Sequence, residues 1–168
     1  MSQDILLLTA LIAVILMGSA MCSGIEAALL AVNPLRVHEL ARRNPKVLGA
    51  RRLEKLRHRI GRTLTVVTIA NNSFNIFGSL MVGSYASFIF QNKYGNVKPI
   101  FFIGLTILVL LLGEIVPKAL GTRLALQISL TSAPVLDFLS IVMRPLLLVL
   151  ERLLPIITAK SELTTDEE

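Results

Sequence analysis

The sequence predicts an all-α membrane protein with three transmembrane helices and amphipathic juxtamembrane helices on the cytoplasmic side. Of its 168 residues, 54% are hydrophobic and only 17% are charged, and the mean hydropathy is +0.71. A water-soluble core of this size cannot bury so much apolar surface. A helix needs roughly 20 mostly apolar residues to cross the hydrocarbon layer of a bilayer. Three stretches of the chain meet that requirement.

The three predicted spans are about residues 5–32, 63–90 and 99–120. The first contains a single charged residue, Glu26, and the second contains none. The third carries only Glu114 before it reaches Pro117. Charges inside a span are costly, so these two glutamates are candidates for a functional site.

A fourth apolar region is different because charged residues interrupt it at intervals of seven: Asp137, Arg144 and Glu151. This spacing places the three charges on one stripe of a helix, which suits the plane of the membrane interface. We therefore expect an interfacial helix over about residues 134–154, with a bend or break at Pro145. The alternative is a fourth spanning helix with paired charges.

These elements divide the chain into a transmembrane domain, residues 1–158, and an acidic segment, residues 159–168, which resembles the beginning of a linker toward a cytoplasmic domain. Orientation follows from the basic residues, since ten of the seventeen lie between Arg36 and Arg62. This juxtamembrane segment, residues 34–62, should face the cytoplasm, which places the N-terminus of this multi-pass cell-membrane protein outside. The same segment attracts anionic membrane lipids and accounts for the net charge of +6, so no nucleic-acid binding is expected.

Polar residues recur at helical spacing inside the spans: Ser19, Ser23 and Glu26 in the first, and Asn71 and Asn75 in the second. Residues at this spacing share one face of a helix. Counted from the cytoplasmic ends of their spans, Ser23 and Asn71 each lie about 14 Å deep at 1.5 Å per residue. Glu114 comes from the same side of the third span. We expect the polar groups of three helices to meet at one level in the inner half of the membrane.

Pro117 lacks the N–H group that would bond the Gly113 carbonyl in a regular helix, so one carbonyl oxygen is freed beside Glu114. A carbonyl, a carboxylate, a serine hydroxyl and asparagine oxygens form an all-oxygen set that suits a hard cation such as Mg²⁺, Ca²⁺ or Na⁺. In the alternative interpretation, Glu114 marks the helix end near water and pairs with Lys118. For Glu26, cation attraction and a helix-end role both stay open.

The segments CSGIEAAL, ANNSFNIFG and GEIVPKALG resemble the membrane domain of the CorC and cyclin-M (CNNM) magnesium transporter family. This resemblance covers nearly the whole chain. It implies a homodimer that exports Mg²⁺ from the cytoplasm in exchange for Na⁺, with a dehydrated Mg²⁺ held between the helices of each subunit. It also implies a CBS-type cytoplasmic regulatory domain in the full-length protein. The Mg²⁺ ligands carried over are Ser23, Asn71, Asn72, Ser73, Asn75, Gly113 and Glu114, with Glu26, Lys118 and Pro117 as possible secondary cation or gating residues.

Two other functions compete with transport. A non-transporting sensor or scaffold for a cytoplasmic part would keep the spans but tolerate the loss of Glu114. An intramembrane enzyme with Ser23 as nucleophile would need a base, and no span contains a histidine or a suitably placed lysine, so we expect no enzyme. Small residues at intervals of four, such as Ser79, Gly83 and Ser87, allow close helix approach either within one chain or between two.

Overall fold

A computed structural model describes residues 2–43, 47, 49–90 and 98–153, and every regular element in these ranges is a helix. The elements are α1 (Ser2–Ala31), α2 (Pro34–Arg43), α3 (Ala50–Arg57), α4 (Ile60–Phe90), α5 (Lys98–Leu108), the π-helical η1 (Val109–Ile115), α6 (Val116–Arg123), α7 (Ala125–Val142) and α8 (Arg144–Leu153). The chain forms two compact units, residues 1–32 with 67–128, and residues 33–66 with 129–168. The all-α prediction is confirmed for the described part of the chain.

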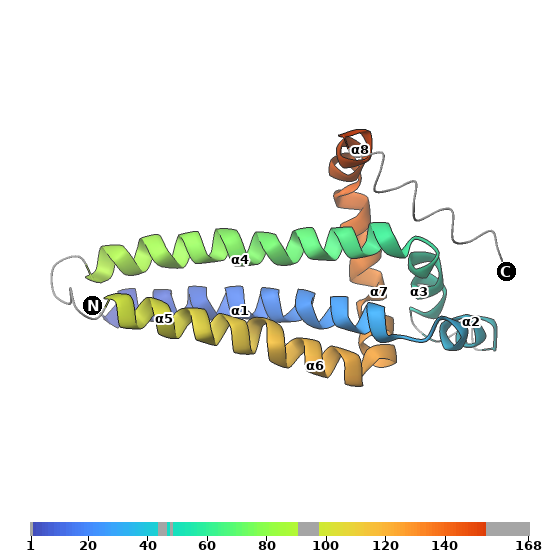
Figure 1. The fold of residues 1–168 in the computed structure, drawn as a ribbon, viewed down its shortest axis with the longest axis horizontal. Coiled ribbons are helices and arrows are strands. Elements are labelled where there is room, and N and C mark those ends of the chain that lie inside the picture. Colours follow the sequence, from blue (N-terminus) through green and yellow to red (C-terminus); the bar gives the residue numbers. More distant parts are fainter. Residues whose placement is uncertain (1, 44–46, 48, 91–97, 154–168) are drawn as a thin grey trace. The chain divides into compact units, whose positions relative to one another are not determined.

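Long helices occupy all three stretches predicted to span the membrane. In the first unit, α1, α4 and the run α5–η1–α6 lie side by side (Figure 1). Four described helices are long and apolar enough to cross a membrane: Gln3–Ala31, Ile60–Phe90, Pro99–Arg123 and Ala125–Val142. Because α7 meets this requirement as well, the count of three crossings stays a prediction.

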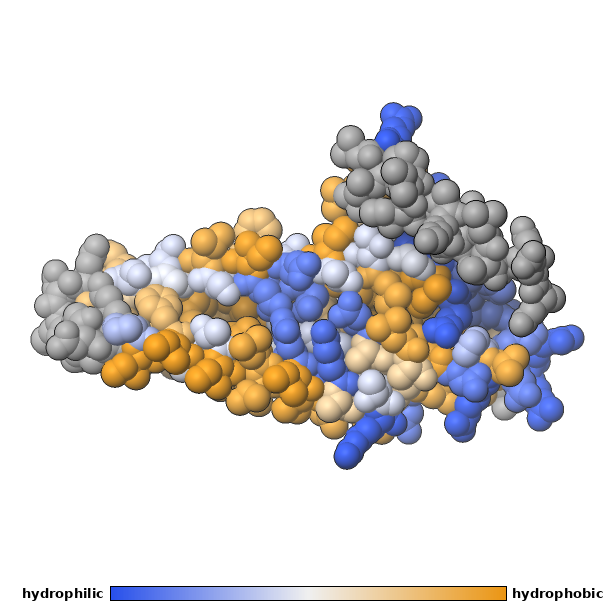
Figure 2. All heavy atoms as spheres, in the orientation of Figure 1, coloured by the Kyte–Doolittle hydropathy of each residue, from blue (hydrophilic) through white to orange (hydrophobic). Residues whose placement is uncertain are grey.

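The first unit has the polarity of a protein surrounded by lipid. Large apolar side chains point outward, among them Leu6, Phe77 and Ile100, whereas Ser19 and Ser23 are completely buried. Figure 2 shows apolar side chains along much of the visible face of α4 and α5, with a band of hydrophilic residues about midway along α4. A buried polar interior beneath an apolar surface is stable in hydrocarbon and unstable in water.

Glycines bring the helices of this unit into backbone contact. A Cβ atom on Gly121 of α6 would overlap the carbonyl oxygen of Gly24 on α1. Small residues permit such close approach in membranes, where van der Waals packing drives helix association. Gly24 and Gly121 therefore serve packing within this chain.

The helix that carries Pro117 is irregular before the proline as well as at it. Over Val109–Ile115 the backbone is π-helical, and the Val116 N–H bonds the Leu111 carbonyl, five residues earlier. Pro117 itself lies in the first turn of α6, where a missing N–H is tolerated. A π-helical turn widens the helix and is frequent at functional sites. The sequence predicted the proline effect but not the extent of this irregular turn.

The second unit contains two short amphipathic helices in the basic segment. Val37 of α2 and Leu53 of α3 are buried, and His38 Nδ1 lies 2.7 Å from Glu54 Oε1 across the two helices. Gly49 begins α3 with a φ of 86°, and a Cβ atom there would overlap the Leu130 carbonyl oxygen of α7. Only glycine adopts this conformation at so close an approach without strain.

The C-terminal region forms two helices where the sequence predicted one interfacial helix over about 134–154. Helix α7 begins at Ala125 and ends at Val142, and α8 begins at Arg144. The break falls at Met143, two residues before Pro145, and agrees with the predicted bend or break at that proline. The acidic segment 159–168 lies outside the described residues.

Candidate cation-binding site

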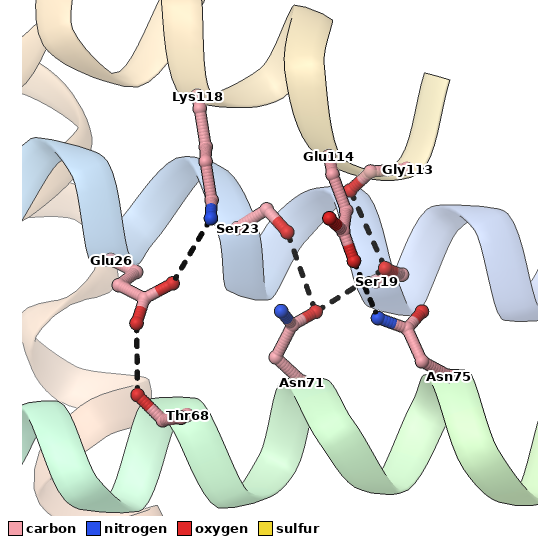
Figure 3. Close-up of polar contacts among 9 residues, drawn as sticks. All are labelled: Ser19, Ser23, Glu26, Thr68, Asn71, Asn75, Gly113, Glu114 and Lys118. Carbon is pink, nitrogen blue, oxygen red and sulfur yellow. Dashed lines mark hydrogen bonds and ion pairs between the residues drawn. The ribbon is translucent and has the colours of Figure 1, made fainter. Parts of the chain in front are cut away.

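Oxygen atoms from three helix segments meet in the first unit. Asn71 Oδ1 on α4 lies 3.2 Å from the Ser19 hydroxyl and 3.4 Å from the Ser23 hydroxyl, both on α1 (Figure 3). The Ser19 hydroxyl also lies 3.4 Å from the Gly113 carbonyl oxygen of η1. All four residues are buried. The expected meeting of the three helices is observed, and we call this group the oxygen cluster.

Asn75 and Glu114 extend the oxygen cluster by one helical turn. Asn75 Nδ2 donates a hydrogen bond of 2.9 Å to Glu114 Oε1. The Asn75 Oδ1 atom is buried and has no hydrogen-bond partner among the described residues. An unsatisfied buried acceptor costs about 1–3 kcal/mol, so this oxygen is a candidate ligand for a cation.

The hydrogen bonds within the oxygen cluster are long. Hydroxyl-to-oxygen bonds are usually about 2.7–2.8 Å, so the contacts of 3.2–3.4 Å around Ser19 are weak. Neighbouring oxygens around an octahedral ion are ~3.0 Å apart for Mg²⁺ and ~3.5 Å apart for Ca²⁺, from their usual bond lengths. The observed separations lie between these values. The oxygen–oxygen separations in the cluster are therefore within the range found around small hard cations.

The structure distinguishes the two glutamates in the spans by their partners. Glu26 Oε1 accepts a 2.8 Å hydrogen bond from Thr68, and Glu26 Oε2 lies 3.8 Å from Lys118 Nζ (Figure 3). The alternative pairing of Lys118 with Glu114 is not formed. Among the described residues, Asn75 is the one recorded polar partner of Glu114, and an amide does not balance the carboxylate charge. Glu114 is therefore the carboxylate better suited to a cation.

Two of the seven expected ligands lie outside the oxygen cluster. Asn72 is exposed, and the Ser73 hydroxyl bonds the Ile69 carbonyl of its own helix at 2.8 Å. The other five, Ser23, Asn71, Asn75, Gly113 and Glu114, lie in the cluster or its extension. Because successive residues of a helix point about 100° apart, Asn71 and Asn72 cannot both face the same site.

Ser19 belongs to the oxygen cluster although it was absent from the expected ligand set. Its hydroxyl lies within hydrogen-bonding distance of both Asn71 and Gly113, which makes it the link between α4 and η1. The signal was present in the sequence, because Ser19 precedes Ser23 by four residues and so shares its face of α1. Gly113 allows this contact, since a Cβ atom there would lie 3.3 Å from the Ser19 hydroxyl oxygen.

The site contains one carboxylate and otherwise neutral oxygens. In the described ranges, no three histidine, cysteine, aspartate or glutamate side chains come together as a metal-binding group. Hydroxyl, amide and carbonyl oxygens are ligands for hard cations. The hard-cation class expected from the sequence stays a prediction.

Apolar helices of spanning length around a buried polar site define a helical membrane domain with a candidate ion site. The chain belongs to the cyclin M transmembrane N-terminal domain family, whose model matches residues 10–168. This membership confirms the resemblance to the CorC and cyclin-M family.

Relatives of this family occur in several bacteria. The chain is 36% identical over 148 residues to UPF0053 protein sll1254 of Synechocystis sp., covering 87% of this chain and 41% of that protein. It is 28% identical over 149 residues to UPF0053 inner membrane protein YfjD of Escherichia coli, covering 88% and 33% respectively. A UPF0053 protein of Haemophilus influenzae is 33% identical over 129 residues, covering 76% and 29%. The chain thus spans less than half the length of these relatives.

Proposed function

We propose that this domain transports Mg²⁺ across the membrane, with the ion bound in the oxygen cluster between α1, α4 and η1. The proposal rests on one observation above all: Glu114 has no basic partner among the described residues, and Asn75, which donates a hydrogen bond to it, carries a buried Oδ1 without a partner. A carboxylate in hydrocarbon requires a proton, a basic partner or a cation. A bound divalent ion removes both the uncompensated charge and the unsatisfied acceptor.

Binding of the ion requires only small side-chain movements in the oxygen cluster. The Ser19 and Ser23 hydroxyls rotate so that their protons leave Asn71 and their lone pairs face the ion. The bonds given up are those of 3.2–3.4 Å, which contribute little. Mg²⁺ loses its water reluctantly, so a preformed set of oxygens held by closely packed helices offsets the cost of dehydration.

The ion pair between Glu26 and Lys118 is a candidate gate for this pathway. Glu26 lies three residues beyond Ser23, and Lys118 lies four residues beyond Glu114, so the pair sits one helical turn from the site on the side predicted to be cytoplasmic. Opening the pair exposes a second carboxylate to an approaching cation. We propose that Mg²⁺ leaves the cytoplasm by this route and that Na⁺ moves in the opposite direction.

The remaining parts of the proposal concern the assembly. We propose that two chains form a homodimer with one ion site in each, and that the full-length protein adds a CBS-type cytoplasmic regulatory domain. The greater length of the relatives leaves room for such a domain. The basic segment 34–62 faces the cytoplasm in this proposal, with the N-terminus outside.

Flux of Mg²⁺ in reconstituted liposomes tests the proposal. Glu114→Gln preserves the shape of the side chain and an acceptor for Asn75 but removes the charge, and Ser23→Ala removes one hydroxyl ligand. Removing one charged partner from a buried ion pair is costly in free energy. We therefore expect Glu114→Gln to lower the affinity for Mg²⁺ about a hundredfold. Glu39→Gln makes the same carboxylate-to-amide change at an exposed position of α2 and serves as the matched control.

Undiminished flux in both Glu114→Gln and Ser23→Ala would overturn the site and favour a sensor or scaffold. Loss of flux in the Glu39→Gln control as well would show that the assay reports membrane insertion. An imposed Na⁺ gradient tests the counter-ion separately, because a coupled exchanger moves Mg²⁺ against its own gradient when Na⁺ flows the other way.

A further inference from the structure

The second unit contains a basic pocket that the proposed transport does not use. It has a volume of about 280 Å³ and lies where the end of α3 and the start of α4 meet α7 and α8. Four basic side chains line it, Lys55, Arg59, Arg62 and Arg144, together with one carboxylate, Asp137. Even with Arg62 left out of the count, three basic side chains stand against one carboxylate in this lining, so the pocket favours an anion.

Hydrogen bonds from Thr63 brace the corner between α3 and α4. The buried Thr63 side chain donates its hydroxyl to the carbonyls of Leu56 and Arg59, at 3.1 Å each. The Thr63 N–H also bonds the Arg59 carbonyl at 3.0 Å. These bonds fix the backbone that carries three of the four basic side chains. A preformed positive pocket binds an anion without the entropic cost of ordering its backbone.

The apolar part of the pocket indicates what kind of anion it takes. Leu56 and Leu147 are buried in its floor, while Leu148 is 53% exposed beside it. Exposed apolar residues of α8 continue from the pocket, including Leu146 and Val149. A basic pocket with an apolar border is suited to an amphiphile, whose charged head enters the pocket while its chain lies along the helix.

Chain connectivity places the pocket at the level of the lipid headgroups. Arg62 directly precedes the predicted span 63–90, so the basic side chains lie at the boundary between the membrane and water. The pocket volume of about 280 Å³ is large enough to hold a phosphate group.

We propose that this pocket binds the phosphate group of an anionic phospholipid. The arginine guanidinium groups supply paired N–H donors that match phosphate oxygens. The bound lipid connects α3 and the start of α4 to α7 and α8. The lipid composition of the inner leaflet thereby determines whether this contact of the basic segment 34–62 is formed. This inference is independent of the cation site and stands whether or not the domain transports Mg²⁺.

Lipid retention by the purified 168-residue chain tests the proposal. The protein is equilibrated with mixed detergent and phosphatidylcholine micelles containing phosphatidic acid or phosphatidylglycerol, and the lipids that remain bound are counted by native mass spectrometry. In the double variant Arg59→Gln/Arg144→Gln, two pocket charges are lost. At about fivefold per charge, we expect an affinity loss of about thirtyfold. The control Arg51→Gln/Arg52→Gln removes the same charge from exposed positions of α3 outside the pocket and should lose less than about threefold.

Competition with soluble inorganic phosphate distinguishes the two sources of the anion. Retention of anionic lipid that resists millimolar phosphate supports a lipid site, whereas binding of phosphate alone assigns the pocket to a soluble phosphate compound. Equal losses in the pocket variant and the control would overturn the proposal, because they would reflect general attraction to a basic surface. Unchanged lipid retention in the pocket variant, with its helical content intact by circular dichroism, would overturn it as well.

Discussion

Lys118 Nζ lies 3.8 Å from Glu26 Oε2 on another helix, although Glu114 precedes Lys118 by four residues on its own helical run. Residues four apart on a regular helix are neighbours, so a local pairing of Lys118 with Glu114 was the simpler expectation. The structure instead places the lysine against α1, because α6 packs against α1 through Gly24 and Gly121. Because Lys118 pairs with Glu26, Glu114 stays available to the oxygen cluster.

The strength of the pair between Lys118 and Glu26 is measurable by a double-mutant cycle. Lys118 is half exposed and the separation is long, so we expect a coupling of only about 0.2–1 kcal/mol between Lys118→Met and Glu26→Gln. Thermal unfolding in detergent, followed by circular dichroism, gives the stability of the wild type, both single variants and the double variant. Strictly additive losses would mean that the pair is not formed in solution.

Substitutions of the asparagines of α4 should differ in their effect on Mg²⁺ affinity according to position. Asn71→Ala and Asn75→Ala each remove an oxygen of the candidate site and are expected to lower Mg²⁺ affinity at least about tenfold. Asn72→Ala, one residue further along the helix, changes an exposed side chain and should leave affinity within about twofold. Isothermal titration calorimetry of the purified variants checks this order. A dominant effect of Asn72 would require a different rotation of α4.

Gly113 and Ser19 should act as one unit. A Cβ atom on residue 113 would lie 3.3 Å from the Ser19 hydroxyl oxygen, so Gly113→Ala shifts that hydroxyl by a few tenths of an ångström within the oxygen cluster. We expect Gly113→Ala and Ser19→Ala each to weaken Mg²⁺ binding about tenfold, the value of one lost polar ligand, and the double variant to be little worse than either. Calorimetric titration of the three variants gives the coupling. Multiplicative losses would show that Ser19 and Gly113 contribute independently.

Backbone contact between α1 and α6 predicts different tolerance of alanine at two glycines. Gly121→Ala inserts a methyl group against the Gly24 carbonyl and should destabilise the domain by about 1–3 kcal/mol. Gly104→Ala, on α5, meets no atom within 4 Å and should be neutral or stabilising by up to ~1 kcal/mol, because alanine favours helix. Thermal unfolding of both variants in the same detergent makes the comparison. Equal stability of the two would argue against the close packing of α6 on α1.

The sequence alone determined the membrane class, the positions of the long helices and the faces that carry polar groups. These properties are local: hydrocarbon thickness fixes the length of a span, and helical periodicity fixes which residues share a face. Ser23, Asn71 and Glu114 could therefore be assigned to one level before any contact between helices was known. The break before Pro145 followed in the same way from the missing N–H of proline.

The tertiary structure decided which polar groups meet. The rotation of α4 brings Asn71 to the site and turns Asn72 outward, and the π-helical turn before Pro117 places Gly113 against Ser19. The partner of Lys118 was decided in the same way, by the contact of α6 with α1. Rotation and axial offset of packed helices depend on contacts between residues far apart in the chain, and a local pattern does not specify them.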